Sequence, residues 1–74
     1  MTAAARDRIA ERMIANMRRV NTPVSELQEV AAANYLSGAK ETLSLMEIPC
    51  GLTWDTIRGY TSLTLDGATY SVEP

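Results

Sequence analysis

The sequence predicts an α+β fold, in which an antiparallel two-helix hairpin is followed by a C-terminal two-stranded β-hairpin (ααββ). Two observations support this prediction. Apolar residues recur with the period of a helix through the first 46 residues, and they alternate with polar residues near the C-terminus. A chain of 74 residues suffices for one small domain, so we treat residues 1–74 as a single unit.

The first predicted helix spans about residues 3–20. Thr2 is suited to cap its N-terminus, and the alanines that follow are strong helix formers. Two arginines in its last turn complement the helix dipole. One side of this helix is apolar, and that stripe comprises Ala5, Ile9, Ala10, Met13, Met17 and Val20, with Ile14 at its edge.

The second predicted helix spans about residues 23–46. Proline suits the first position of a helix with Thr22 as its cap, and Ser25 with Gln28 offers a later start through a capping box. Because the connection is short, the two helices are expected to lie antiparallel. The predicted apolar face of this helix is broad and contains Val24, Leu27, Ala31, Tyr35, Ala39, Thr42, Leu45 and Met46.

Gly38 lies in the middle of the second helix. A glycine inside a helix costs about 1 kcal/mol relative to alanine, so a helix that ends at Ser37 is the alternative. The apolar face keeps its phase before and after Gly38, and this favours one continuous helix.

Residues 47–59 are predicted to form a loop, because Pro49 and Gly51 interrupt regular structure there. Within this loop, residues 53–58 are interpreted as one short helical turn that Thr53 caps. An extended segment is the alternative interpretation.

Residues from about 60 to 72 predict a β-hairpin with Asp66-Gly67 in a two-residue type I′ turn. The turn fixes the register, because a shift of one residue would mix the apolar and the hydroxyl-rich faces. At least one strand edge stays open unless the 48–59 segment covers it. The predicted pairs are Leu65–Ala68, Leu63–Tyr70 and Thr61–Val72 on one face, and Thr64–Thr69 and Ser62–Ser71 on the other.

The composition argues against several kinds of site. The chain has no histidine and one cysteine, whereas a structural zinc site needs about four Cys or His ligands and a disulfide needs a cysteine pair. We therefore expect no metal, no cofactor and no histidine-based catalysis. Cys50 has no histidine to act as its base, and Glu47 with Asp55 is weak evidence for hydrolysis. The protein is predicted not to be an enzyme.

The core is expected to be thin, because 23 large apolar side chains, none of them phenylalanine, must stabilise 74 residues. Chains this short often gain stability by oligomerisation. The leading hypothesis is a non-enzymatic interaction and assembly module, a homo-oligomer or a small subunit of a larger complex, such as a phage or mobile-element accessory protein. The candidate contact residues are Met13, Met17, Gly38, Trp54 and Leu63. For the methionines and Trp54, a place in the core is the alternative.

The charge is distributed unevenly along the chain. Residues 1–20 carry five arginines against two acidic residues, a net charge of +3, and residues 21–74 carry two basic against seven acidic residues, a net charge of −5. Arg8, Arg12 and Arg19 lie on one flank of the first helix, where arginine is suited to bind phosphates. A small nucleic-acid-binding protein is therefore the first alternative, and pairing of these arginines with acidic residues of the chain itself or of a second copy is the competing interpretation.

A third hypothesis is an acidic inhibitor that binds a basic surface of a host protein through Glu26, Glu29, Glu41 and Glu47. The longest apolar run is far shorter than the approximately 20 residues of a membrane span. We expect no membrane contact and a cytoplasmic or virion-associated location.

Overall fold

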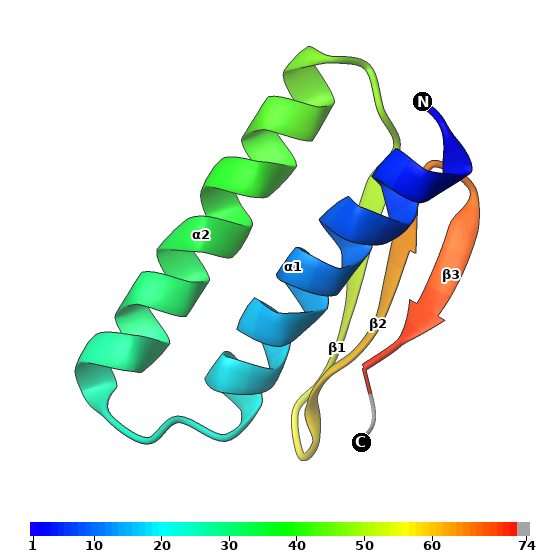
Figure 1. Cartoon of the computed structure of the whole chain (residues 1–74). Coiled ribbons are helices and arrows are strands. Elements are labelled where there is room, and N and C mark those ends of the chain that lie inside the picture. The colour runs from blue at the N-terminus through cyan, green and yellow to red at the C-terminus, as the bar shows by residue number, and fades with distance from the viewer. Residues whose placement is uncertain (73–74) are drawn as a thin grey trace.

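The computed structural model describes residues 1–72 and consists of two packed helices followed by a three-stranded antiparallel sheet. Helix α1 spans Ala3–Asn21 and helix α2 spans Glu26–Leu45. Strands β1, β2 and β3 span Cys50–Asp55, Gly59–Leu65 and Ala68–Ser71, in the sheet order β1-β2-β3. The two helices lie side by side (Figure 1), with α1 in contact with β2 and α2 in contact with β1.

The prediction for α1 is confirmed. The Thr2 hydroxyl oxygen accepts a hydrogen bond from the Ala5 N–H group at 3.1 Å and caps the helix. The predicted apolar stripe faces the interior, where Ala10, Met13 and Met17 are buried and the other large apolar members pack against them.

Helix α2 begins at Glu26 rather than at residue 23. Ser25 is the N-cap, and its hydroxyl oxygen accepts the Gln28 N–H group at 3.2 Å, so the later of the two predicted starts is confirmed. Pro23 and Val24 belong to the connection between the helices. The helix continues through Gly38 to Leu45, as its unbroken apolar phase indicated.

The broad apolar face of α2 is not the side that packs into the core. Leu27, Leu45 and Met46 are exposed, and of the eight residues of that face only Ala39 is half-buried. The residues that do face the interior are Ala32, Leu36 and Leu43. Apolar residues occur on most sides of this helix, so their spacing did not identify which side packs on α1.

The prediction of a two-stranded sheet with a loop over residues 47–59 is also wrong. Cys50–Asp55 forms β1, which pairs antiparallel with β2 and covers one edge of the predicted hairpin. The interpretation of residues 53–58 as a helical turn capped by Thr53 fails with it. Only Cys50 and Leu52 point inward in regular alternation, and an irregularity between Thr53 and Trp54 interrupts the pairing. The alternation of inward and outward residues that indicates a strand is therefore too short here to be recognised in the sequence.

The C-terminal hairpin has the predicted register. Leu63 pairs with Tyr70 and Leu65 with Ala68, and the Val72 N–H group continues the pairing by donating to the Thr61 carbonyl at 3.0 Å. Two positive φ angles, 50° at Asp66 and 85° at Gly67, give the turn the backbone that a type I′ turn requires. Pairing of Thr64 with Thr69 and of Ser62 with Ser71 follows the prediction as well.

The core lies between the helices and the sheet, and α2 contributes Leu36 and Leu43 to it. Leu63, Leu65 and Val72 from the sheet side are fully buried with Met13 and Met17. Neither of the two helices in residues 1–72 is both long and apolar enough to cross a membrane.

Candidate interaction surfaces

The side chains that carry chemistry do not converge in the part of the chain that the structure describes. Within residues 1–72 no group of three or more His, Cys, Asp or Glu side chains is placed to hold a metal ion. Glu47 precedes β1 and Asp55 ends it, so the two carboxylates lie at opposite ends of that strand. Burial raises the pKa of the Cys50 thiol, which disfavours the reactive thiolate.

The main feature of the surface is a set of large apolar side chains on and beside α2. Leu27 is 79% exposed and Leu45 is 80% exposed, which is unusual for leucines on a helix that also packs on a neighbour. We call this set the outer apolar surface, and it comprises Val24, Leu27, Val30, Tyr35, Leu45 and Met46.

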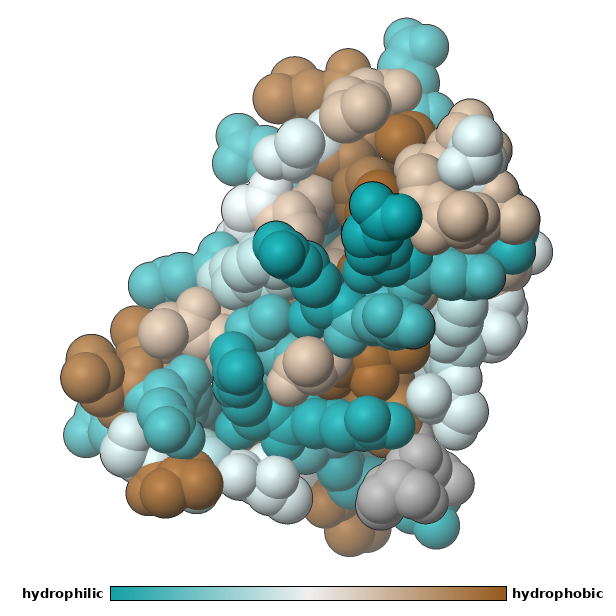
Figure 2. Space-filling view, in the orientation of Figure 1, coloured by the Kyte–Doolittle hydropathy of each residue, from teal (hydrophilic) through white to brown (hydrophobic). Residues whose placement is uncertain are grey.

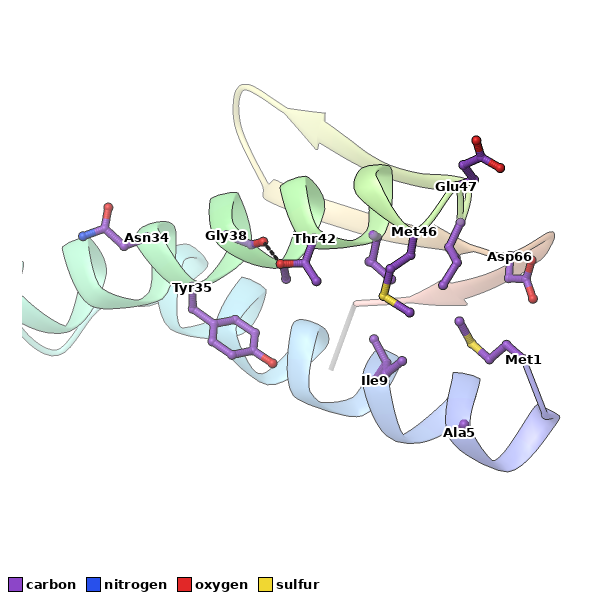
Figure 3. A pocket seen from close by; sticks show the side chains of 13 residues that line it. Met1, Ala5, Ile9, Asn34, Tyr35, Gly38, Thr42, Met46, Glu47 and Asp66 are labelled. Carbon is purple, nitrogen blue, oxygen red and sulfur yellow. Dashed lines mark hydrogen bonds between the residues drawn. The ribbon is translucent and has the colours of Figure 1, made fainter.

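An open groove of about 1030 Å³ continues this surface between the N-terminal half of α1 and the C-terminal half of α2. Ile9 and Met46 line it from the two helices, and Met1 and Tyr35 stand at its sides (Figure 3). Most of the lining is apolar, so the groove favours an apolar occupant over a charged one.

Gly38 lies in the wall of the groove, and the fold itself gives no reason for a glycine there. A Cβ atom built at Gly38 meets nothing within 4 Å, and its backbone is helical. The Gly38 carbonyl accepts a hydrogen bond from the Thr42 hydroxyl at 2.9 Å. The helix therefore presents bare backbone to the outside at this residue.

The three arginines of the nucleic-acid hypothesis lie on the exposed side of α1. Arg8, Arg12 and Arg19 are all exposed, and none of them forms an ion pair with another described residue. Intramolecular pairing with Glu26, Glu29 or Glu41 is thus absent from residues 1–72. Figure 2 shows hydrophilic side chains gathered over α1 in the middle of the view, with hydrophobic ones beside them over α2.

The four glutamates of the inhibitor hypothesis are also exposed. Glu26 and Glu29 lie in the first turn of α2, where carboxylates complement the helix dipole, and Glu41 and Glu47 lie near its other end. The four glutamates thus form two pairs, one at each end of α2, and the two pairs are separated by about the length of the helix.

A second apolar surface is found at the turn between β1 and β2. Ile57 is 93% exposed and Trp54 is 53% exposed, with the Trp54 ring edge-to-face with Tyr60 at 4.7 Å between ring centroids. The Asp55 carboxylate accepts the N–H groups of Ile57 at 2.8 Å and Arg58 at 3.0 Å, and these bonds lower its pKa. Trp54 thus packs against Tyr60 at the surface and lies outside the core.

Three of the candidate contact residues are in the interior. Met13, Met17 and Leu63 have no exposed surface, so in this structure they build the core and are not available to a partner. Val30 and Ile57 are exposed as well, although neither was predicted to be a contact residue. The isolated apolar Ile57 beside Asp55 and Gly59, both turn-forming residues, is the signal that indicates a protruding turn.

Comparisons of the chain with protein-family models, with characterised proteins and with solved structures gave no match.

Proposed function

We propose that this protein is a non-enzymatic interaction and assembly module that acts as a homo-oligomer or as a small subunit of a larger complex. The observation that carries the proposal is the outer apolar surface, whose two leucines are about four-fifths exposed. Several large apolar side chains exposed on one small protein are typical of a protein–protein contact. A phage or mobile-element assembly inside the cell or in the virion is the setting we propose for it.

The total surface supports the same proposal. A compact monomeric protein of 8.1 kDa has an accessible surface of about 4500 Å². This chain exposes 5055 Å². The excess is about 560 Å², or roughly two thirds of the area of about 800 Å² that each partner buries in a standard protein interface.

Light scattering on a sizing column, at low and at moderate salt, tests the proposal. We expect a mass above 8.1 kDa that survives moderate salt, because the contact is apolar. Leu45→Glu should lower this mass, and Ile57→Glu is the matched control, since it places the same charge at an exposed apolar residue outside the surface.

A subunit of a larger complex gives a different result in the same experiment. Such a subunit has the mass of a monomer when it is alone, and its exposed apolar surface binds an apolar fluorescent dye. Leu45→Glu reduces the fluorescence of the bound dye, while Ile57→Glu does not reduce it. A monomer whose dye binding is unaffected by Leu45→Glu contradicts the proposal in both forms.

Nucleic-acid binding is the second candidate, and it is favoured by one observation: Arg8, Arg12 and Arg19 are exposed and form no ion pair within residues 1–72. It predicts binding of duplex or single-stranded DNA or RNA that weakens steeply with salt and that Arg12→Gln reduces. Absence of any binding at low salt rules it out.

A further inference from the structure

We propose that the exposed side of α2, which carries Leu27 and Leu45 of the outer apolar surface, is covered by a second copy of this chain, with the two α2 helices packed antiparallel across a two-fold axis at the level of residue 36. This inference rests on the proposed function and specifies the partner and the geometry. The contact stripe, which we call the α2 seam, consists of Leu27, Ala31, Asn34, Gly38, Glu41 and Leu45.

The α2 seam is one continuous stripe. Its members are spaced by 4, 3, 4, 3 and 4 residues, which is the spacing of a helix that packs along a partner helix. All of them are exposed, and they lie opposite the side on which Leu36 and Leu43 are buried. The helix thus uses one side for its own core and leaves the other for a neighbour.

The pattern of the seam matches itself when reversed. Residues that face each other across a two-fold axis must be complementary, because the same surface is used twice. An antiparallel pair centred on residue 36 places Leu27 opposite Leu45 of the second copy, at both ends of the contact. It places Asn34 opposite Gly38 and Ala31 opposite Glu41.

Side-chain size along the seam fits this arrangement. Leucines close the two ends, and Ala31 and Gly38 let the helix backbones approach in the middle. The bare backbone at Gly38, which nothing in the described chain covers within 4 Å, is then filled by the Asn34 carboxamide of the second copy. A polar residue in the centre of a helix pair also fixes its register.

Charge favours the antiparallel over the parallel arrangement. A parallel pair in register sets Glu41 against Glu41 and brings the acidic first turns of the two α2 helices, with Glu26 and Glu29, to the same end. The antiparallel pair sets Glu41 against Ala31 and separates the acidic turns. Like charges opposite each other across a helix contact are destabilising.

The area of the surface argues for a second copy rather than for a small ligand. Leu27 and Leu45 are separated by 18 residues, or about 27 Å of helix. A contact of this length along one helix, together with the excess of surface over a compact monomer, is on the scale of a small dimer interface.

Disulfide cross-linking tests the arrangement in the full-length chain. Cys50→Ser removes the natural thiol, and Leu27→Cys or Leu45→Cys is added singly to that variant. Antiparallel pairing brings residues 27 and 45 of different copies together, whereas two copies of residue 27 stay about 27 Å apart, too far for a disulfide. We therefore expect linked dimers under mild oxidation from a mixture of the two variants and not from either one alone. Ile57→Cys measures the background from random collision.

The possible results separate this inference from the proposed function. If each cysteine variant forms disulfide-linked dimers with itself, the antiparallel geometry is overturned. If the protein has a dimeric mass but its linkage does not exceed that of Ile57→Cys, the α2 seam is overturned. The assembly function stands in both cases. A monomer at every concentration, measured on the unmodified chain, overturns the second copy as partner. As a second variant, Gly38→Leu should shift the dimer to higher concentrations by at least tenfold without loss of helix content. An unchanged dimer in Gly38→Leu also counts against the seam.

Discussion

The side chain of Asn21, the last residue of α1, binds the backbone of Tyr60 in β2 through both of its polar atoms. The Oδ1 atom accepts the Tyr60 N–H group at 2.6 Å, and the Nδ2 atom donates to the Tyr60 carbonyl at 2.9 Å. These are the two bonds that a neighbouring strand would supply, so the Asn21 side chain acts as a strand partner for Tyr60. The contact ties the end of α1 to the beginning of β2.

Asn21→Ala is expected to destabilise the protein by about 1–3 kcal/mol, because two half-buried backbone groups of Tyr60 lose their partner. The free energy of unfolding, measured by chemical denaturation, checks this. Gln28→Ala is the control, since only the backbone of Gln28 is bonded at its end of α2. Equal stability of the two variants refutes the role given to Asn21.

Gly59→Ala is expected to destabilise the protein by more than about 1–3 kcal/mol, which is the usual cost of holding a non-glycine residue in the left-handed backbone conformation. Gly59 has a φ angle of 82°, and a Cβ atom there collides with the Asn21 side chain. Gly51→Ala provides the comparison, because a Cβ atom at Gly51 meets nothing within 4 Å. Thermal or denaturant unfolding of both variants measures the difference, and a Gly59→Ala protein as stable as Gly51→Ala contradicts the packing described.

Tyr70→Phe is expected to lower the free energy of unfolding at neutral pH, measured by chemical denaturation, because it removes two hydrogen bonds. The Tyr70 hydroxyl donates to the Asp7 carboxylate at 2.6 Å and accepts from the Arg6 Nε atom at 2.8 Å, so it joins β3 to α1. Tyr35→Phe is the control, because the Tyr35 hydroxyl forms no hydrogen bond with a described residue.

The same residue predicts a pH dependence. The hydrogen bond to Asp7 raises the pKa of Tyr70 above its usual value of 10.0, which means that folding favours the protonated phenol. The contribution of the Tyr70 hydroxyl to the free energy of unfolding is therefore fully present below pH 10. It is lost as the pH rises through the higher pKa that Tyr70 has in the folded state. The stability difference between the wild-type protein and Tyr70→Phe should shrink in alkaline solution. A difference that stays constant there argues against the bond.

Gly38→Ala is expected to act in opposite directions on folding and on assembly. In dilute protein it should stabilise α2 by about 1 kcal/mol, since alanine is the better helix former and the added Cβ atom meets nothing within 4 Å. At high concentration it should weaken self-association, because it separates the helices at the centre of the α2 seam. Denaturation of dilute samples and light scattering of concentrated samples measure the two effects separately. A loss of stability in the dilute protein contradicts the open environment of Gly38.

Local patterns in the sequence were sufficient for the elements whose neighbours in space are also neighbours in the chain. The C-terminal hairpin is the clearest case, because Asp66-Gly67 fixes the turn and the alternation around it fixes the register. The stripe on α1 was equally clear, since α1 contacts both α2 and the sheet and so buries most of its apolar side chains. The start of α2 at Ser25 was among the predicted possibilities, because capping depends only on residues within one turn.

The tertiary structure decided what depends on contacts between distant parts of the chain. Cys50–Asp55 becomes a strand because β2 offers it a free edge, not because its own residues alternate over a sufficient length. Helix α2 is apolar on several sides, and only its packing on α1 selects Ala32, Leu36 and Leu43 for the core and leaves Leu27 and Leu45 outside. The sequence by itself therefore determined the helices and the hairpin, whereas the third strand, the clamp of Asn21 on Tyr60 and the position of the outer apolar surface follow from packing between elements that are far apart in the chain.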